Sequence, residues 1–175
     1  MRKQFPLFLL FAVTVILSSC SKDNNEEINA TEASLIGTWN LTALETNDGR
    51  AVTIIEGESV VSDFTAVGKD FDSVIVFSEN PQIVTSEGSY TTVLTTTVMG
   101  QTTTQEEPGE NFFESDEWRL DGNLLYFRTG EEEIALTIIA LSDSEITLRY
   151  TIDETIDALG TTISVKATYN MTLSK

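Results

Sequence analysis

The side chains best suited to chemistry in this sequence are carboxylates that stand close together. The compact groups are Asp70 with Asp72, Asp116 with Glu117, and Asp153 with Glu154 and Asp157. Two carboxylates about 5 to 10 Å apart can hydrolyse a glycosidic bond. With 28 acidic residues in the chain, however, neighbouring acids arise by chance, and successive residues of a strand face opposite ways. We therefore expect a protein that is not an enzyme.

The missing residue types exclude several kinds of site. The chain has 175 residues, with no His and one Cys, which excludes His-based triads, His-ligated zinc, CxxC redox sites and internal disulfides. Acidic loops could offer oxygen ligands to calcium, but no Asp-x-Asp-x-Asp-Gly register occurs. We assign no catalytic residue, no metal ligand and no cofactor.

The charge balance bears on possible partners. Ten Lys and Arg stand against 28 Asp and Glu, which gives a net charge of −18. Without residues 1–19, which hold two basic and no acidic side chains, eight basic residues remain against 28 acidic ones and the net charge is −20. Such a surface repels polyphosphate, so we expect no nucleic-acid partner.

Aromatic side chains are better candidates for a binding site than the acids. Tyrosine carries a polar tip on an apolar body, and mostly apolar pockets with a few polar groups bind small molecules. The alternative is that these rings simply fill the interior. The candidates for ligand binding are Tyr90, Trp118, Tyr126, Tyr150 and Tyr169.

The elements that must position these rings are β-strands. From about residue 33, Thr, Val and Ile recur with a period of two, with turn residues between the runs. In the last segment Ile163, Val165, Ala167 and Tyr169 alternate with polar residues, which predicts one dry and one wet face. The expected strands are 38–46, 51–67, 73–78, 82–85, 89–99 continued by 101–105, 118–120, 124–127, 134–141, 146–152 and 162–174.

The pattern predicts one all-β domain of about eight to ten antiparallel strands. Consecutive strands joined by hairpins form an up-and-down meander, and closing it into a β-barrel removes the exposed edges. Three polar stretches are expected to be loops: Glu106–Asn111, Glu131–Glu133 and Asp153–Gly160.

The first twenty residues have the features of an export signal. Arg2 and Lys3 precede the apolar run Phe5–Leu17, which as a helix spans only about 20 Å and is too short for a bilayer. Leu17-Ser18-Ser19-Cys20 resembles the lipobox of bacterial lipoproteins. That resemblance implies cleavage of residues 1–19, lipidation of Cys20 and, because Ser21 follows it, an outer-membrane lipoprotein of the cell envelope in either leaflet. Residues 20–33 are expected to form a flexible tether, whose Ser21–Glu27 part also resembles a surface-export tag.

The start of the expected first strand adds a second resemblance. Gly37-Thr38-Trp39 is similar to the Gly-x-Trp start of the lipocalin-like (calycin) superfamily, and residues 34–175 resemble lipocalin-like domains of bacterial lipoproteins. In that family the Trp closes one end of the barrel beneath a basic residue of a late strand. The resemblance implies this role for Arg149, or failing that Lys166, although alternation places both opposite the apolar side chains.

Two functions agree with these features. The first is a membrane-anchored, monomeric lipocalin-like protein that binds a small hydrophobic or amphipathic ligand. The second is an envelope interaction module with a filled barrel, whose acidic loops Glu106–Glu110 and Glu131–Glu133 bind a protein or glycan. The size of the interior cavity decides between them, because about eight strands enclose room for side chains or for one small ligand.

Overall fold

A computed structural model of the chain describes residues 28–109, 112–113, 116–158 and 160–175. In these residues one short helix precedes nine strands. The signal segment, Cys20 and residues 21–27 lie outside the described residues. The elements are α1 (Glu32–Leu35), β1 (Gly37–Ile55), β2 (Glu58–Phe77), β3 (Ile83–Val98), β4 (Gln101–Gly109), β5 (Asp116–Asp121), β6 (Leu124–Thr129), β7 (Glu132–Leu141), β8 (Glu145–Ala158) and β9 (Thr161–Ser174).

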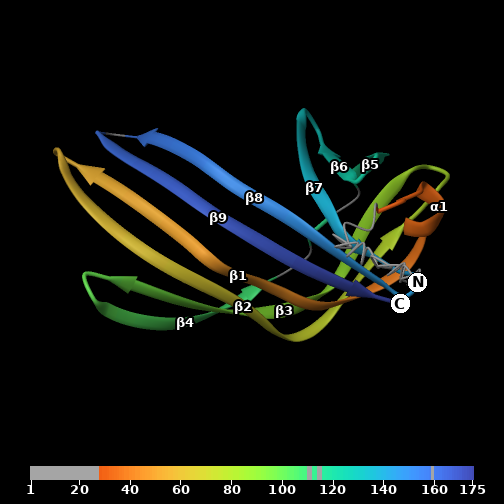
Figure 1. Cartoon of the computed structure of the whole chain (residues 1–175), viewed down its shortest axis with the longest axis horizontal. Coiled ribbons are helices and arrows are strands. Elements are labelled where there is room, and N and C mark those ends of the chain that lie inside the picture. Colours follow the sequence, from red (N-terminus) through yellow and green to blue (C-terminus); the bar gives the residue numbers. More distant parts are fainter. Residues whose placement is uncertain (1–27, 110–111, 114–115, 159) are drawn as a thin grey trace, which may run out of the picture.

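The strands form one antiparallel sheet that closes in a ring (Figure 1). The ring runs from β1 through β9, β8, β7, β6, β5 and β3 to β2, which pairs with β1 again. Strand β4 lies outside the ring. Strand β3 pairs with β5 only at Ile83 and Val84, and its later residues, Tyr90–Val98, pair with β4. The predicted all-β fold with a single antiparallel sheet is confirmed.

Several strands are longer than the sequence pattern predicts. The expected strand 51–67 is wrong, because the turn Glu56–Gly57 divides it: residues 51–55 end β1 and residues 58–67 begin β2. Strand β2 then continues through most of the expected strand 73–78 to Phe77, with a register shift between Lys69 and Asp72. All three expected loops are wrong at least in part: Asp153–Ala158 continues β8, Glu106–Gly109 continues β4, and Glu132 and Glu133 begin β7. Their charged residues predicted loops, but a strand that is exposed to water on both faces can also contain charged residues. For example, Asp153 pairs with Lys166 across β8 and β9 at 2.8 Å.

The molecule has two unlike parts along its length (Figure 1). At one part, which we call the closed end, α1 and the short strands β5, β6 and β7 complete the ring. The other part, which we call the arm, consists of the portions of β1–β2, β8–β9 and β3–β4 that extend past β7. Strand β7 pairs with β8 only over Ile146–Arg149, so the rest of β8 has β9 alone as a neighbour among the described strands.

The hydrophobic core lies at the closed end. Trp118 packs edge-on against Phe77 with ring centroids 5.5 Å apart, and Phe127 stacks on Phe113 at 4.4 Å. Ile28 and Ala30 also pack against this core, so the packed part of the chain begins ahead of the expected boundary at residue 34. Among the described residues, no helical segment has the length and apolar character needed to cross a bilayer.

Candidate ligand-binding pocket

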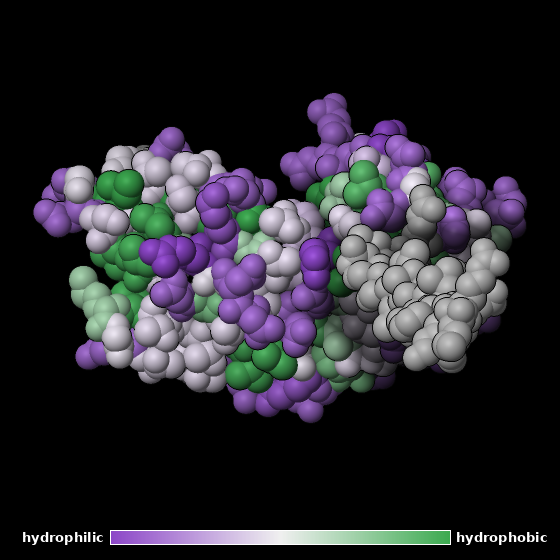
Figure 2. Space-filling model, in the orientation of Figure 1, coloured by the Kyte–Doolittle hydropathy of each residue, from purple (hydrophilic) through white to green (hydrophobic). Residues whose placement is uncertain are grey.

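A pocket lies where the closed end opens into the arm. Its volume is about 520 Å³, within the range of about 300 to 1,000 Å³ typical of small-molecule sites. Figure 2 shows a notch in the outline between the tips of the arm at the left and the β5–β7 part at the upper right. The lining residues are Leu44, Ala66, Tyr90, Thr92, Leu94, Glu107, Phe112, Phe113, Ile134, Leu136, Leu148, Tyr150, Ile152, Tyr169 and Met171.

Cross-strand pairing brings these side chains together. Tyr150 of β8 lies directly opposite Tyr169 of β9. One step further towards the closed end, Met171 lies between Leu148 of β8 and Leu44 of β1. Because strand side chains alternate between faces, this pairing lines the inside of the sheet with a continuous apolar surface.

Stacked rings form one wall of the pocket. Tyr90 stacks on Phe112 with centroids 4.9 Å apart and planes 4° apart, and Phe71 lies 6.3 Å from Tyr90. Across the sheet Tyr90 pairs with Gly109, and a Cβ atom on Gly109 would overlap the Tyr90 ring. The glycine therefore lets the ring lie flat against β4, which fixes the position of the wall.

The polar groups of the pocket are few and mostly neutral. Burial raises the pKa values of Tyr90 and Tyr169, so both phenols keep their protons at neutral pH and can donate hydrogen bonds. Thr92 adds a hydroxyl and Glu107 a carboxylate. The arrangement can hold an apolar body and hydrogen-bond to one polar group.

Three of the five predicted ligand-binding residues line this pocket: Tyr90, Tyr150 and Tyr169. Trp118 lies outside this pocket: the residue is 3% exposed, belongs to the core, and donates from Nε1 to the Ser78 carbonyl at 3.1 Å. Tyr126 also lies outside this pocket, on the face opposite the buried Leu125 and Phe127, where Arg119 covers its ring at 3.5 Å.

Sequence reasoning missed the adjacent pair Phe112 and Phe113, which contributes two rings to the pocket. Their signal was an apolar pair within a strongly acidic stretch. Phe113 is held to β3 by three hydrogen bonds with Ser86. Its backbone N–H donates to Ser86 Oγ at 2.9 Å, and its carbonyl accepts from the Ser86 backbone N–H at 2.8 Å and from Ser86 Oγ at 3.1 Å. These hydrogen bonds fix the position of Phe112 and Phe113 next to β3.

The far side of the closed end is sealed around Trp39. The Trp39 ring is fully buried, and its Nε1 donates to the Leu35 carbonyl at 2.7 Å. Gly37, the first residue of β1, has a φ of +127°, a conformation that favours glycine. The Lys175 ammonium lies 4.4 Å from the Trp39 ring centroid.

The expected pairing of Trp39 with Arg149, or with Lys166, is wrong. Arg149 points to the outer face, next to the buried Leu148, and donates to Asn170 Oδ1 at 3.1 Å. Lys166 is engaged with Asp153. Lys175 is the basic residue that lies over the Trp39 ring. Strands β1 and β9 pair with Asn40 opposite Ser174, so Lys175, which follows Ser174, lies next to Trp39, which precedes Asn40.

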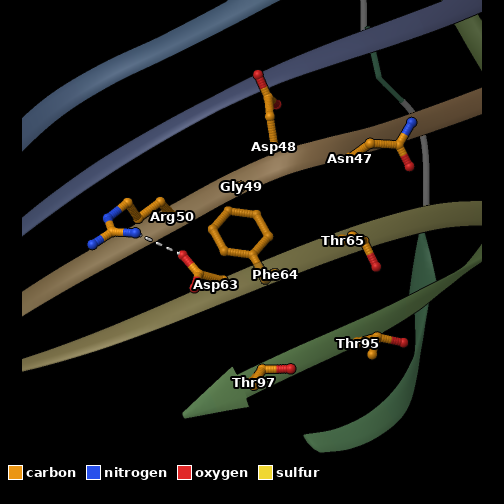
Figure 3. Close-up of a pocket in the computed structure, with 9 residues that line it drawn as sticks. All are labelled: Asn47, Asp48, Gly49, Arg50, Asp63, Phe64, Thr65, Thr95 and Thr97. Atoms are coloured by element: carbon orange, nitrogen blue, oxygen red, sulfur yellow. Dashed lines mark hydrogen bonds and ion pairs between the residues drawn. The ribbon is translucent and has the colours of Figure 1, made fainter. Parts of the chain in front are cut away.

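A second, smaller hollow lies beside a bulge in β1 (Figure 3). Its volume is about 370 Å³. Arg50, its one basic lining residue, is already paired with Asp63 at 3.1 Å. The bulge is bridged by Asp48, whose carboxylate accepts from the Thr168 backbone N–H at 2.8 Å and from Thr46. These hydrogen bonds, that from Thr168 first, lower the pKa of Asp48.

The acidic segments proposed as interaction loops are partly neutralised within the chain. Glu106 accepts from Lys69 at 2.8 Å, and Glu133 accepts from Arg119 at 2.8 Å and from Arg128 at 3.3 Å. These contacts, Arg119 above all, lower the pKa of Glu133. No three acidic side chains converge on a metal-sized site within the part of the chain that the structure describes.

Comparisons of the chain with protein-family models, with curated proteins and with solved structures gave no match. The site must therefore be judged on its own geometry.

Proposed function

We propose that the protein is a lipid-anchored, lipocalin-like carrier or sensor of the cell envelope that binds a small hydrophobic or amphipathic molecule as a monomer. The observation that carries the binding function is the pocket of about 520 Å³ whose apolar lining is interrupted by three tyrosines. A protein with a filled interior would have no space of this size between its strands. The lining also suits binding better than hydrolysis, because Glu107 is the single carboxylate among its described residues.

The anchor is proposed from the sequence around Cys20. One acyl chain gives only marginal membrane affinity, whereas two or more give a stable anchor. Ile28 and Ala30 pack against the core of the closed end, so an anchor ahead of them would hold the domain by that end. A carrier held in this way would keep its pocket accessible to molecules of the envelope.

The alternative interaction module has weaker support. Its acidic segments were expected to be free loops, but Glu106 is part of β4 and paired with Lys69, and Glu133 is paired with Arg119. Their charge is therefore partly compensated, and less of it is available to a partner.

Native mass spectrometry of the protein purified from its own cells tests the binding function. We expect a mass in excess of the polypeptide and its anchor that disappears on denaturation, together with release of a small apolar molecule on solvent extraction. A homogeneous unliganded mass, with no uptake when apolar compounds are added, would contradict the proposal.

The anchor has a separate test. Replacing Cys20 with Ala should abolish the lipid mass shift and leave the protein as an unprocessed precursor. A Ser18→Ala variant is the matched control, since it changes a neighbouring residue but keeps the cysteine. Unchanged processing and membrane fractionation of the Cys20 variant would contradict the assignment.

A further inference from the structure

The charge that lines the pocket is negative, without a basic residue to balance it among the described residues. Of the fifteen described residues that line it none is Lys or Arg, and Glu107 is the one acid among them. Glu107 faces the pocket from β4, opposite Thr92. Its carboxylate makes no ion pair or hydrogen bond with any residue that the structure describes, whereas the preceding Glu106 points to the other face and pairs with Lys69.

The basic side chains of the described residues are all engaged elsewhere. Five of them are in ion pairs with carboxylates, one donates to an amide oxygen, and one covers an indole ring. These contacts are Arg50 with Asp63, Lys69 with Glu106, Arg119 and Arg128 with Glu133, Lys166 with Asp153, Arg149 with Asn170, and Lys175 with Trp39. Within residues 28–175, as far as the structure describes them, no unengaged cation is therefore left at the pocket to balance a negatively charged ligand.

An anionic head group would meet two costs in this pocket. Glu107 is exposed, so the head group would keep part of its water there, but the water that it loses would not be replaced by a cationic partner, which is unfavourable for an ionised group. The head group would also lie near the Glu107 carboxylate in a chain of net charge −18, and like charges disfavour the ionised form. A hydroxyl or ammonium group would instead be stabilised in the pocket, because it can donate a hydrogen bond to the Glu107 carboxylate. Hydrogen bonds to a charged group are stronger than those between neutral groups.

We propose that the ligand is an amphiphile whose polar group carries no negative charge and donates a hydrogen bond, with Glu107 as the acceptor that determines this specificity. The proposal rests on the proposed binding function and adds the chemical class of the ligand. The three tyrosines and the stacked rings hold the apolar body.

A series of three ligands with one chain length tests the specificity. Dodecylamine, dodecanol and dodecanoate, each below its micelle concentration, are titrated against the protein loaded with the uncharged fluorescent probe N-phenyl-1-naphthylamine at neutral pH. We expect dodecylamine to displace the probe at least as well as dodecanol, and dodecanoate to bind more weakly by about tenfold or more. Added salt should narrow these differences, because it screens charge.

Glu107→Gln is the test of the assigned residue, and Glu106→Gln is its matched control. The control removes a carboxylate of the same strand that faces away from the pocket. We expect Glu107→Gln to weaken dodecylamine relative to dodecanol by about tenfold and to improve dodecanoate, and Glu106→Gln to leave the order unchanged. Far-ultraviolet circular dichroism of both variants establishes that the sheet is retained.

The outcomes separate the two proposals. Dodecanoate binding as tightly as dodecanol would overturn the specificity and leave ligand binding intact. Equal responses to Glu107→Gln and Glu106→Gln would overturn the role of Glu107. Failure of the probe and of all three ligands to bind would overturn the proposed function and this inference with it.

Discussion

The closed end and the arm share several long strands, yet only the closed end is packed. Strand β8 passes through both. Its inward residues Ile146 and Leu148 are 0% and 1% exposed, whereas Ile156, on the same face, is 57% exposed. The difference arises because β5, β6 and β7 stand opposite the sheet only at the closed end. The pocket lies at the boundary, where the facing strands stop.

This comparison shows that alternation along a strand does not decide burial. Alternation decides which side chains share a face, but an opposing layer is needed to exclude water from that face. The tips of the arm accordingly leave apolar side chains exposed, including Ile55 and Met99. The predictions below test whether the two parts differ in stability as their packing implies.

The largest expected effect is at the packed core. Phe127→Ala removes a ring that is 1% exposed and stacked on Phe113, and should lower the free energy of unfolding by about 3 to 5 kcal/mol. Leu94→Ala, at the pocket wall, should cost about 2 kcal/mol or less, because its side chain already borders open space. Urea unfolding followed by circular dichroism measures both. Equal losses would show that the two regions are packed alike.

The next effect concerns the close approach of Tyr90 to β4. Gly109→Ala should destabilise the protein by about 1 to 3 kcal/mol through overpacking and displace the aromatic wall, which weakens ligand binding. Gly100→Ala is the control, because nothing lies within 4 Å of a Cβ atom there, although its φ of +79° carries a backbone cost. If Gly100→Ala weakened binding as much as Gly109→Ala, the contact with Tyr90 would not hold the wall.

A pH-dependent effect is expected at the bulge that separates the two parts of β1. The pKa of Asp48 is lowered in the folded state, chiefly by the Thr168 backbone N–H. Its contribution is therefore complete above the unfolded pKa of about 3.9 and is lost as the pH falls through the lower folded value. Asp48 is exposed, so the effect is about 1 kcal/mol or less.

Asp48→Asn isolates this contribution. The difference in unfolding free energy between the native chain and the variant should be greatest at about pH 6 and shrink below about pH 4. Urea unfolding at a series of pH values measures it. A difference that is independent of pH would contradict a role for the Asp48 charge.

The smallest effect is at the sealed side of the closed end. Lys175→Ala should cost about 0.5 to 1 kcal/mol by removing the cation over Trp39, and should also shift the tryptophan fluorescence. Arg149→Ala, which removes only an exposed contact with Asn170, should cost less and leave the fluorescence unchanged. A larger effect from Arg149→Ala would reverse the assignment of the cation.

The sequence predicted the strands of the sheet, but not the orientation of every side chain or the register between strands. In β9 the alternation of Ile163, Val165 and Ala167 with polar residues correctly identified the inward face. In β6 the run Leu124-Leu125-Tyr126-Phe127 is apolar throughout, so alternation could not tell that Tyr126 faces outward. The position of Lys175 depends on the register of β9 against β1, and no local pattern records such a register.

The sequence did not predict the length of the strands in the arm, for a different reason. Residues such as Asp153 and Glu106 resemble loop residues in sequence, but cross-strand ion pairs accommodate them on wetted strands. The contribution of Phe112 and Phe113 to the pocket was not predictable either, because this pair lies between strands and its place is set by hydrogen bonds to Ser86.

Blocking the pocket tests most directly the claim that the boundary between the two parts is a binding site. Leu94→Trp places a large ring in the pocket, whereas Val93→Trp places the same ring on the opposite face of β3. We predict that N-phenyl-1-naphthylamine binds to the native chain and to Val93→Trp with similar affinity, and to Leu94→Trp at least about tenfold more weakly. Equal binding by both variants would contradict the account.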